Sequence, residues 1–454
     1  MPRREFDIFA TKVAKFLDPH LVLAVLNNVR AHSGRLPLLP LPPLSTPPLP
    51  SPPRPPPSLP SSPPSQFTKD SGLYDSRSVL EATLAIAKRT RLVGFSLDLF
   101  ESLQALPDAG PPDAAELERL HSAERAYDTE FKACVSACGP LIDIVGLTDD
   151  APPEVLTRLR EEDCFTMEVL SREHGVTPAH LQALYATAKV RYDAGWYLGT
   201  YEYLRAYEAL RYPKRDDVPL ELTWGKFATA LVADTLKEAD EERMHLAEAL
   251  KRRPPSVLPD IQRLQQRTWL LHWSLFLLSA YPARREALIE FYMQEENLMC
   301  VSLTCPWLLR YIIAAVLPHR RFKQVYARAL VRLLTPEALA LADPFVTFLH
   351  ALLVDFDFVA AQKVIQDCRD ACATDFFLER IASATFLSTA RGFLFDVYCR
   401  VHQKIDLRAL ASQVHMSEDE AEKWVVGLIR SADLDAKVDS EARTIEMLQA
   451  APSV

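Results

Sequence analysis

The sequence is poor in glycine, with only 12 glycines among 454 residues, whereas leucine, alanine, arginine and glutamate are abundant. Glycine supplies the positive-φ positions of tight hairpins and lets a backbone approach phosphates closely. Its scarcity therefore disfavours a hairpin-rich fold and favours helices. The motifs GxGxxG, GxxxxGKS/T and HExxH are also absent, so we predict no catalytic residue and no cofactor.

The chain also lacks an excess of positive charge and a long hydrophobic run. It carries 51 Lys and Arg against 60 Asp and Glu, a net charge of -9, which disfavours general nucleic-acid binding through phosphate contacts. The most apolar stretch, residues 269–281, is interrupted by His272 and is too short to span a bilayer. We therefore expect a soluble, cytoplasmic protein with no membrane partner.

The eight cysteines do not form a metal-binding pattern. Cys134 and Cys138, like Cys368 and Cys372, have the i,i+4 spacing that puts two residues on one helix face. Neither pair is accompanied by a CxxC motif or by histidines that would complete four zinc ligands. We interpret the cysteines as reduced thiols that pack within helices, and we predict no metal site.

Apolar residues recur at helical spacing through most of the chain, and prolines separate successive helices. At 181–210, small and aromatic residues surround Gly195, a pattern typical of two antiparallel helices in a tetratricopeptide-like pair. Similar pairs continue to about residue 372 without a strict sequence period. The predicted segments are N-terminal helices at 1–28, a proline-rich disordered insert at 29–66, continued helices at 67–180, helical repeats at 181–385 and a winged helix at 386–450.

The insert has a composition that cannot form a packed core, since residues 36–65 contain fifteen prolines, seven leucines and six serines. It fits a polyproline linker, a ligand for an SH3-type domain centred on 52–57, or translated non-coding sequence. We favour the last, because pyrimidine-rich codons specify Pro, Leu and Ser, as in the tract before a 3′ splice site. Removing about 29–66 would join Asn28 to Phe67 without breaking an apolar helix face.

A helix-turn-helix pattern lies near the end of the chain. Ser417 and Glu420 form a capping box at the start of its second helix, and a further helix at about 391–401 precedes the pair. Alternating apolar and polar residues at 434–438 and 444–447 predict a β-hairpin. Three short helices followed by a hairpin are typical of a winged helix.

The second helix of this pattern begins with carboxylates, at Glu418, Asp419, Glu420 and Glu422. In a DNA-binding winged helix this position contacts base edges and phosphates. Negative side chains there repel DNA, so we predict protein–protein contact and no direct DNA binding.

Helical repeats that run into a winged helix are the layout of the PCI domain, which is shared by scaffold subunits of the proteasome lid, the COP9 signalosome and initiation factor 3. Several stretches resemble the e-subunit family of eukaryotic translation initiation factor 3. They are Phe16-Leu17-Asp18 with His20-Leu21-Val22, the tryptophan-rich 265–276, Asp375-Phe376-Phe377-Leu378, and 421–424 through 434–440. The resemblance covers nearly all of the chain outside the insert.

The resemblance implies an all-α fold, a right-handed, tetratricopeptide-like helical-repeat array that ends in a winged-helix domain with a small β-hairpin wing. It also implies a non-catalytic scaffold subunit that supports mRNA recruitment to the small ribosomal subunit. The implied partners are PCI-containing neighbours in initiation factor 3, the small ribosomal subunit and the scaffold protein of the mRNA-cap complex. The alternative is a PCI subunit of the proteasome lid or COP9 signalosome. Relatives carry a further helical tail beyond the wing, where this sequence ends at Val454.

The candidate protein interface is the last predicted strand, Thr444, Ile445, Glu446 and Met447. Strands at the edge of a small sheet expose unpaired N–H and C=O groups, so we expect these residues to extend the sheet of a partner. The resemblance implies the same location, because PCI subunits join through their winged helices.

Two further patterns have simpler structural interpretations. The pair Asp355 and Asp357 precedes an apolar helix start at 359–361, where we predict helix caps rather than acid–base chemistry. His272 is predicted to be a structural histidine with satisfied hydrogen bonds. The helical stripe beside it is predicted to pack in the core, and it comprises Trp269, Leu270, Trp273, Phe276 and Leu277.

Overall fold

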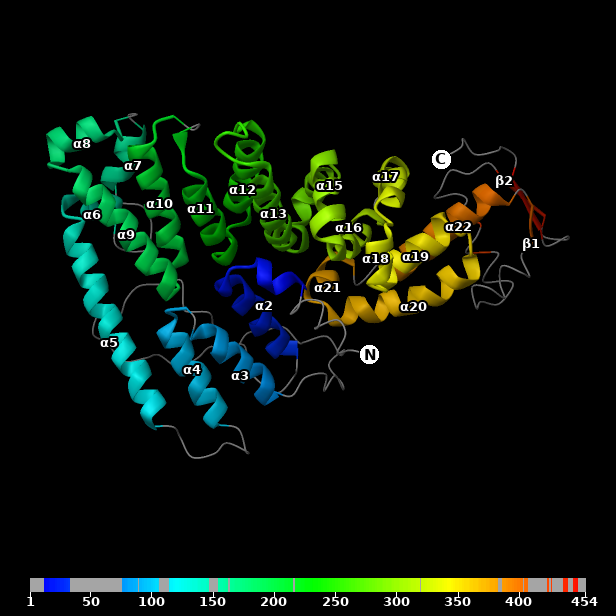
Figure 1. Cartoon of the computed structure of the whole chain (residues 1–454), viewed down its shortest axis with the longest axis horizontal. Coiled ribbons are helices and arrows are strands. Elements are labelled where there is room, and N and C mark those ends of the chain that lie inside the picture. The colour runs from blue at the N-terminus through cyan, green and yellow to red at the C-terminus, as the bar shows by residue number, and fades with distance from the viewer. Residues whose placement is uncertain are drawn as a thin grey trace. The chain divides into compact units, whose positions relative to one another are not determined.

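The chain divides into two compact units in a computed structural model (Figure 1). The N-terminal unit is Leu17–Leu258, and the C-terminal unit combines Met1–Phe16 with Pro259–Val454. The division falls inside the predicted repeat segment 181–385. The structure describes residues 12–32, 76–88, 90–105, 114–146, 154–161, 164–214, 217–318, 320–382, 386–402, 404–406, 423, 426, 436–439 and 444–447.

The described part of the N-terminal unit consists of helices and turns, as the glycine-poor sequence predicts. Helices α2 to α5 pack consecutively, α5 packs on α9, and α9 to α12 lie side by side (Figure 1). Helix α2 runs past the predicted boundary at residue 28, and the proline-rich stretch lies outside the described residues. The helices are α2 (Pro19–His32), α3 (Ser76–Ala87), α4 (Val93–Gln104), α5 (Ala114–Ala137), α6 (Pro140–Val145), α7 (Glu154–Glu161), α8 (Met167–His174), α9 (Pro178–Ala194), α10 (Tyr197–Arg211), α11 (Leu220–Val232) and α12 (Leu236–Arg252).

The predicted helix pair around Gly195 is confirmed in α9 and α10. Thr177 and His180 form a capping box at the start of α9, with Pro178 in its first turn. The helix ends at Gly195, whose φ of 96° lies in the left-handed region that favours glycine. Because the chain reverses there, α10 packs back on α9.

The C-terminal unit is a second set of helices followed by a small sheet. Helix α13 is surrounded by η2, α14, α15 and α21, and α20 packs against both α19 and α22. Its elements are η2 (Ala14–Phe16), α13 (Asp260–Ala280), η4 (Pro282–Arg284), α14 (Arg285–Tyr292), α15 (Glu295–Thr304), η5 (Pro306–Leu308), α16 (Leu309–Val316), α17 (Arg320–Arg332), α18 (Pro336–Ala340), α19 (Pro344–Leu353), α20 (Phe358–Thr374), α21 (Phe376–Ala382), α22 (Phe386–Val401), β1 (Lys404–Asp406), β2 (Ala436–Asp439) and β3 (Thr444–Met447).

The apolar stripe predicted on α13 is buried only in part. Leu270 and Leu277 lie in the core, but Trp269, Trp273 and Phe276 are half-buried. The buried surface extends instead around most of the helix, because neighbours pack on several of its sides. Trp273 lies at the margin, where its indole N–H donates to the Phe16 carbonyl oxygen at 2.9 Å.

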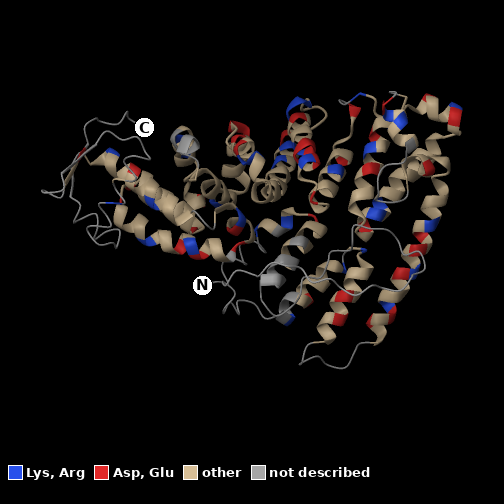
Figure 2. Ribbon diagram, turned by 180° about the vertical axis from the view of Figure 1, so that it is seen from behind, with Lys and Arg blue, Asp and Glu red and all other residues tan. Residues whose placement is uncertain are grey.

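Among the described helices, none alone has the length and apolar composition to cross a membrane. Residues 295–316 meet that test only as a pair of helices bent by 117°. Figure 2 shows Lys and Arg interspersed with Asp and Glu along individual helices, in keeping with the mixed charge of the sequence.

Candidate functional site

The predicted interface residues form β3, the middle strand of a three-stranded antiparallel sheet with the order β1-β3-β2. Ile445 lies opposite Ile405 of β1 and Val438 of β2. Its side chain is fully buried, whereas Glu446 is exposed. Strand β3 is therefore paired along both of its sides.

The prediction that Thr444, Ile445, Glu446 and Met447 form an exposed edge is therefore wrong. The hairpin strands were recognised from their alternating residues, but the three residues of β1 are too short for such a pattern and lie far earlier in the chain. Among the described strands, β1 and β2 are the edges. A proline at Ile445 would remove an N–H donor from this central strand and break the sheet.

The helix before the sheet is confirmed, since α22 covers the predicted 391–401. Phe358, at the start of α20, packs edge-on against Tyr398 of α22, with ring centroids 4.8 Å apart, and lies 5.8 Å from the ring of His402. This aromatic contact fixes the end of α22 from which β1 continues. The predicted helix-turn-helix and its acidic start lie outside the described residues, apart from Lys423 and Val426, and stay predictions.

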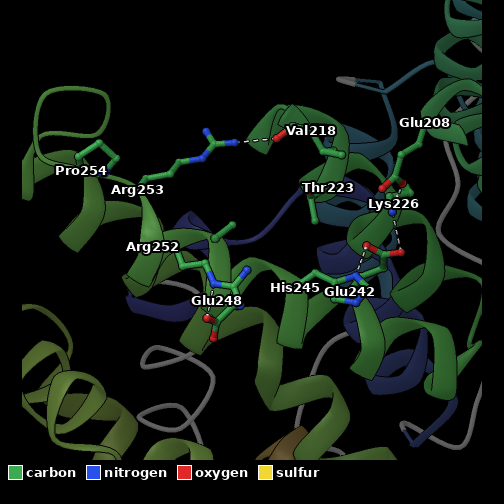
Figure 3. A pocket seen from close by; sticks show the side chains of 11 residues that line it. Glu208, Val218, Thr223, Lys226, Glu242, His245, Glu248, Arg252, Arg253 and Pro254 are labelled. Atoms are coloured by element: carbon green, nitrogen blue, oxygen red, sulfur yellow. Dashed lines mark hydrogen bonds and ion pairs between the residues drawn. The ribbon is translucent and has the colours of Figure 1, made fainter. Parts of the chain in front are cut away.

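A pocket of about 470 Å³ lies among α10, α11 and α12 (Figure 3). The Lys226 ammonium group forms ion pairs with Glu208 and, at 2.8 Å, with Glu242. His245 Nδ1 lies 3.4 Å from Glu242, and we name these four residues the pocket network. Arg253 and Val218 also line the pocket, and the Arg253 guanidinium donates to the Val218 carbonyl oxygen at 2.6 Å.

The pocket network places two carboxylates around one buried ammonium group. Burial opposes ionisation of Glu242, but hydrogen bonds from His245 and Lys226, with the charge of Lys226, lower its pKa below the ordinary value. The Thr223 hydroxyl donates to the Pro219 carbonyl oxygen at 3.3 Å. The carboxylates therefore serve as partners for a buried lysine, which is the arrangement of an internal ion pair rather than of an acid–base catalyst.

A second group of charges, which we name the sealed network, lies inside the C-terminal unit. Arg310 is completely buried, with Nε 3.1 Å from Asp343 and Nη1 3.8 Å from Asp375, and the Tyr311 hydroxyl donates to Asp375 at 2.9 Å. Burial raises the pKa of Asp343, although Arg310 and backbone N–H groups act in the opposite direction.

Both carboxylates of the sealed network also cap helices. Asp343 accepts from the backbone N–H of Phe345 at the start of α19, and Asp375 accepts from that of Phe377 at the start of α21, each at 2.9 Å. Arg310 thus ties two helix N-termini to α16, a structural role. Sequence reasoning missed both networks, because their members lie on different helices and form no local motif.

His272 is a structural histidine, as predicted. Its Nδ1 lies 2.7 Å from the Thr268 carbonyl oxygen, and the Trp307 indole N–H donates to Nε2 at 3.0 Å. Both hydrogen bonds are therefore satisfied by a neutral imidazole, which donates from Nδ1 and accepts at Nε2. Burial, with a smaller contribution from nearby Lys15, lowers the pKa of His272 to about 4.

The predicted carboxylate caps are confirmed for one residue of two. Asp357 accepts from the backbone N–H groups of Val359 and Ala360 at the start of α20. Asp355 instead lies 2.9 Å from Nδ1 of His350, so its prediction as a cap is wrong.

All eight cysteines are free thiols. Across the described residues, no three His, Cys, Asp or Glu side chains gather as metal ligands.

Comparison with known proteins places two family models on the chain. The PCI domain matches residues 362–449, and the domain described as "eIF3 subunit 6 N terminal domain" matches residues 65–191. The first match begins within α20 and includes α21, α22 and the three-stranded sheet. The second includes the helices from α3 to most of α9.

The chain is similar over most of its length to proteins named as the E subunit of eukaryotic translation initiation factor 3. The relative from Phaeosphaeria nodorum is 33% identical over 80% of this chain and 81% of its own length. That from Pyricularia oryzae is 32% identical over 82% and 81%, and that from Arabidopsis thaliana is 29% identical over 86% and 87%. The chain therefore belongs to the E-subunit family of eukaryotic translation initiation factor 3.

Proposed function

We propose that this chain is a non-catalytic scaffold subunit of eukaryotic translation initiation factor 3, which supports mRNA recruitment to the small ribosomal subunit. The main support is the similarity to the E-subunit family over most of both chains, together with the PCI match at 362–449. The proteasome-lid and signalosome alternative is disfavoured, because these relatives are all named as subunits of initiation factor 3.

The arrangement of the charged groups supports a scaffold role. In both networks two carboxylates surround one cation, in the second network both carboxylates also cap helices, and His272 is neutral with both nitrogens engaged. These groups stabilise helix packing and stand in no arrangement of nucleophile and base. The role we propose is to present helical surfaces at fixed positions.

The partners we propose are PCI-containing subunits of the same factor, the small ribosomal subunit and the scaffold protein of the mRNA-cap complex, all in the cytoplasm. We still propose assembly through the sheet, but not through an exposed edge of β3. Among the described strands the outer ones are β1 and β2, and the exposed Glu446 of β3 is available for side-chain contact.

Affinity purification of the tagged full chain at native expression level, followed by mass spectrometry and gradient sedimentation, tests this function. We expect stoichiometric recovery of initiation factor 3 subunits and co-sedimentation with small ribosomal subunits. Nuclease treatment should release the ribosomal particle and leave the factor subunits bound, which separates protein contacts from contacts bridged by RNA. Recovery of lid or signalosome subunits, or of the chain alone, would overturn the proposal.

A further inference from the structure

The turn between α19 and α20 exposes three large apolar side chains close together. Val354, Phe356 and Val359 are 42%, 49% and 48% exposed. Phe356 has a φ of 53°, a left-handed conformation that bulky residues rarely adopt. The backbone strain at Phe356 is therefore not offset by full burial of its side chain in this unit.

Hydrogen bonds on both sides of Phe356 hold the turn in this conformation. Before it, the Asp355 N–H donates to the His350 carbonyl oxygen at 3.1 Å, and after it the Asp357 N–H donates to Ala351 at 2.9 Å. The Asp357 carboxylate then caps α20. Strain that the surroundings maintain in this way is typical of recognition sites.

The turn is anchored beside the segment that leads into the sheet. Phe358 is half-buried and packs on Tyr398 and His402 at the end of α22, where the neighbouring Val401 is 49% exposed. In Figure 1, α20 and α22 lie side by side, and the first residues of α20 lie at the end of α22 where β1 follows. The exposed apolar surface is thus continuous with the PCI region.

We propose that Val354, Phe356 and Val359 form a docking knob that inserts into an apolar socket, rimmed by lysine or arginine side chains, on another subunit of the same factor. This rests on the proposed function. The basic rim is inferred from the exposed residues Asp355 and Asp357, which flank Phe356; Asp355 pairs with His350 and Asp357 caps α20, and both remain exposed to a partner. A buried aromatic anchor within a charged rim is the usual form of an interface hot spot.

Charge also argues against a second copy of this chain as the occupant. A symmetric contact through the knob would bring the carboxylates of Asp355 and Asp357 from two copies together. Like charges would then be desolvated against one another, which disfavours association.

The test compares Phe356→Ala and Phe356→Gly with Ile261→Ala in the tagged full chain. Ile261, on α13 of the same unit, is 83% exposed and provides a matched loss of apolar surface. We expect both Phe356 variants to lower recovery of one factor subunit at least tenfold in high salt, with Ile261→Ala unchanged. The glycine variant should unfold at a temperature no lower than the alanine variant, because glycine relieves the backbone strain.

A photo-crosslinking phenylalanine analogue at position 356 identifies the occupant. Crosslinks to a factor subunit at a peptide containing Lys or Arg support the knob, and Asp355→Lys should then weaken the same contact. Crosslinks within this chain or to a second copy would overturn it, as would unchanged recovery of Phe356→Ala. If the wild type recovers no factor subunits, the proposed function fails; if it recovers them and Phe356→Ala does so equally, only the knob fails.

Discussion

The pocket network and the sealed network place buried charges in two different settings. Lys226 lines a pocket, and its partner Glu208 has a side chain that is 19% exposed. Arg310 and its two carboxylates are almost completely enclosed, and both carboxylates cap helices. Water can replace a lost partner at the pocket, whereas inside the C-terminal unit nothing can. We therefore expect the loss of the cation to cost more stability in the sealed network than in the pocket network.

The largest expected effect comes from Arg310→Met, which leaves Asp343 and Asp375 buried without their cation. We expect a loss of about 3–5 kcal/mol in the free energy of unfolding. Urea denaturation followed by hydrogen exchange in α16, α19 and α21 measures it. The triple variant Arg310→Met/Asp343→Asn/Asp375→Asn retains capping groups without charge and should regain much of the loss. A loss below about 1 kcal/mol for the single variant would remove the distinction between the two networks.

Lys226→Met should cost less, about 2–3 kcal/mol, because hydration from the pocket partly compensates Glu208 and Glu242. Hydrogen exchange in α11 and α12 reports this loss in the N-terminal unit. The double variant Lys226→Met/Glu242→Gln should recover part of it, which a double-mutant cycle quantifies. Equal losses for Lys226→Met and Arg310→Met would show that the pocket gives no compensation.

The burial of His272 also predicts that the free energy of unfolding falls in acid. Because burial lowers the pKa of His272 to about 4 in the folded chain, against 6.5 ordinarily, unfolding takes up a proton between these values. The stability from the neutral ring is present above pH 6.5 and is lost as the pH falls toward 4. At 1.36 kcal/mol per pH unit, we expect a loss of about 2 kcal/mol from this group at pH 5 relative to pH 7.

The control for this prediction is His272→Asn, which keeps a donor for the Thr268 carbonyl oxygen but does not titrate. The variant should be less stable at pH 7 and should show a shallower decline in unfolding free energy down to pH 5. Parallel declines for the two proteins would assign the acid sensitivity to other groups.

The smallest effect is expected for Arg252→Met at the rim of the pocket. Its guanidinium pairs with Glu248 one helical turn earlier, and the Arg252 side chain is 65% exposed. Such pairs contribute up to about 0.5 kcal/mol, so urea denaturation should show a change within that limit. A loss of unfolding free energy near that of Lys226→Met would mean that Arg252 is coupled energetically to the pocket network.

Local features were predictable to the extent that neighbouring residues determine them. Gly195 ends α9, and Asp357 caps α20, because both depend on backbone groups within a few residues. The stripe on α13 was predicted less well. Its tryptophans lie at the margin because several other elements pack around the helix, and periodicity reports amphipathic character but not how many neighbours a helix has.

The sequence by itself determined that this chain is helical and poor in hairpins, because periodicity, capping residues and turn residues act over one or two helical turns. The similarity to PCI-domain subunits was also visible in the sequence, as a resemblance of particular stretches to a known family. Only the tertiary structure decided that β3 is a central strand, since β1 reaches it from residues 404–406, across the segment of the predicted winged helix. The tertiary structure likewise decided that Arg310 pairs with Asp343 and that Lys226 pairs with Glu242. Charge pairing inside a core depends on which helices come together, and no local pattern records that choice.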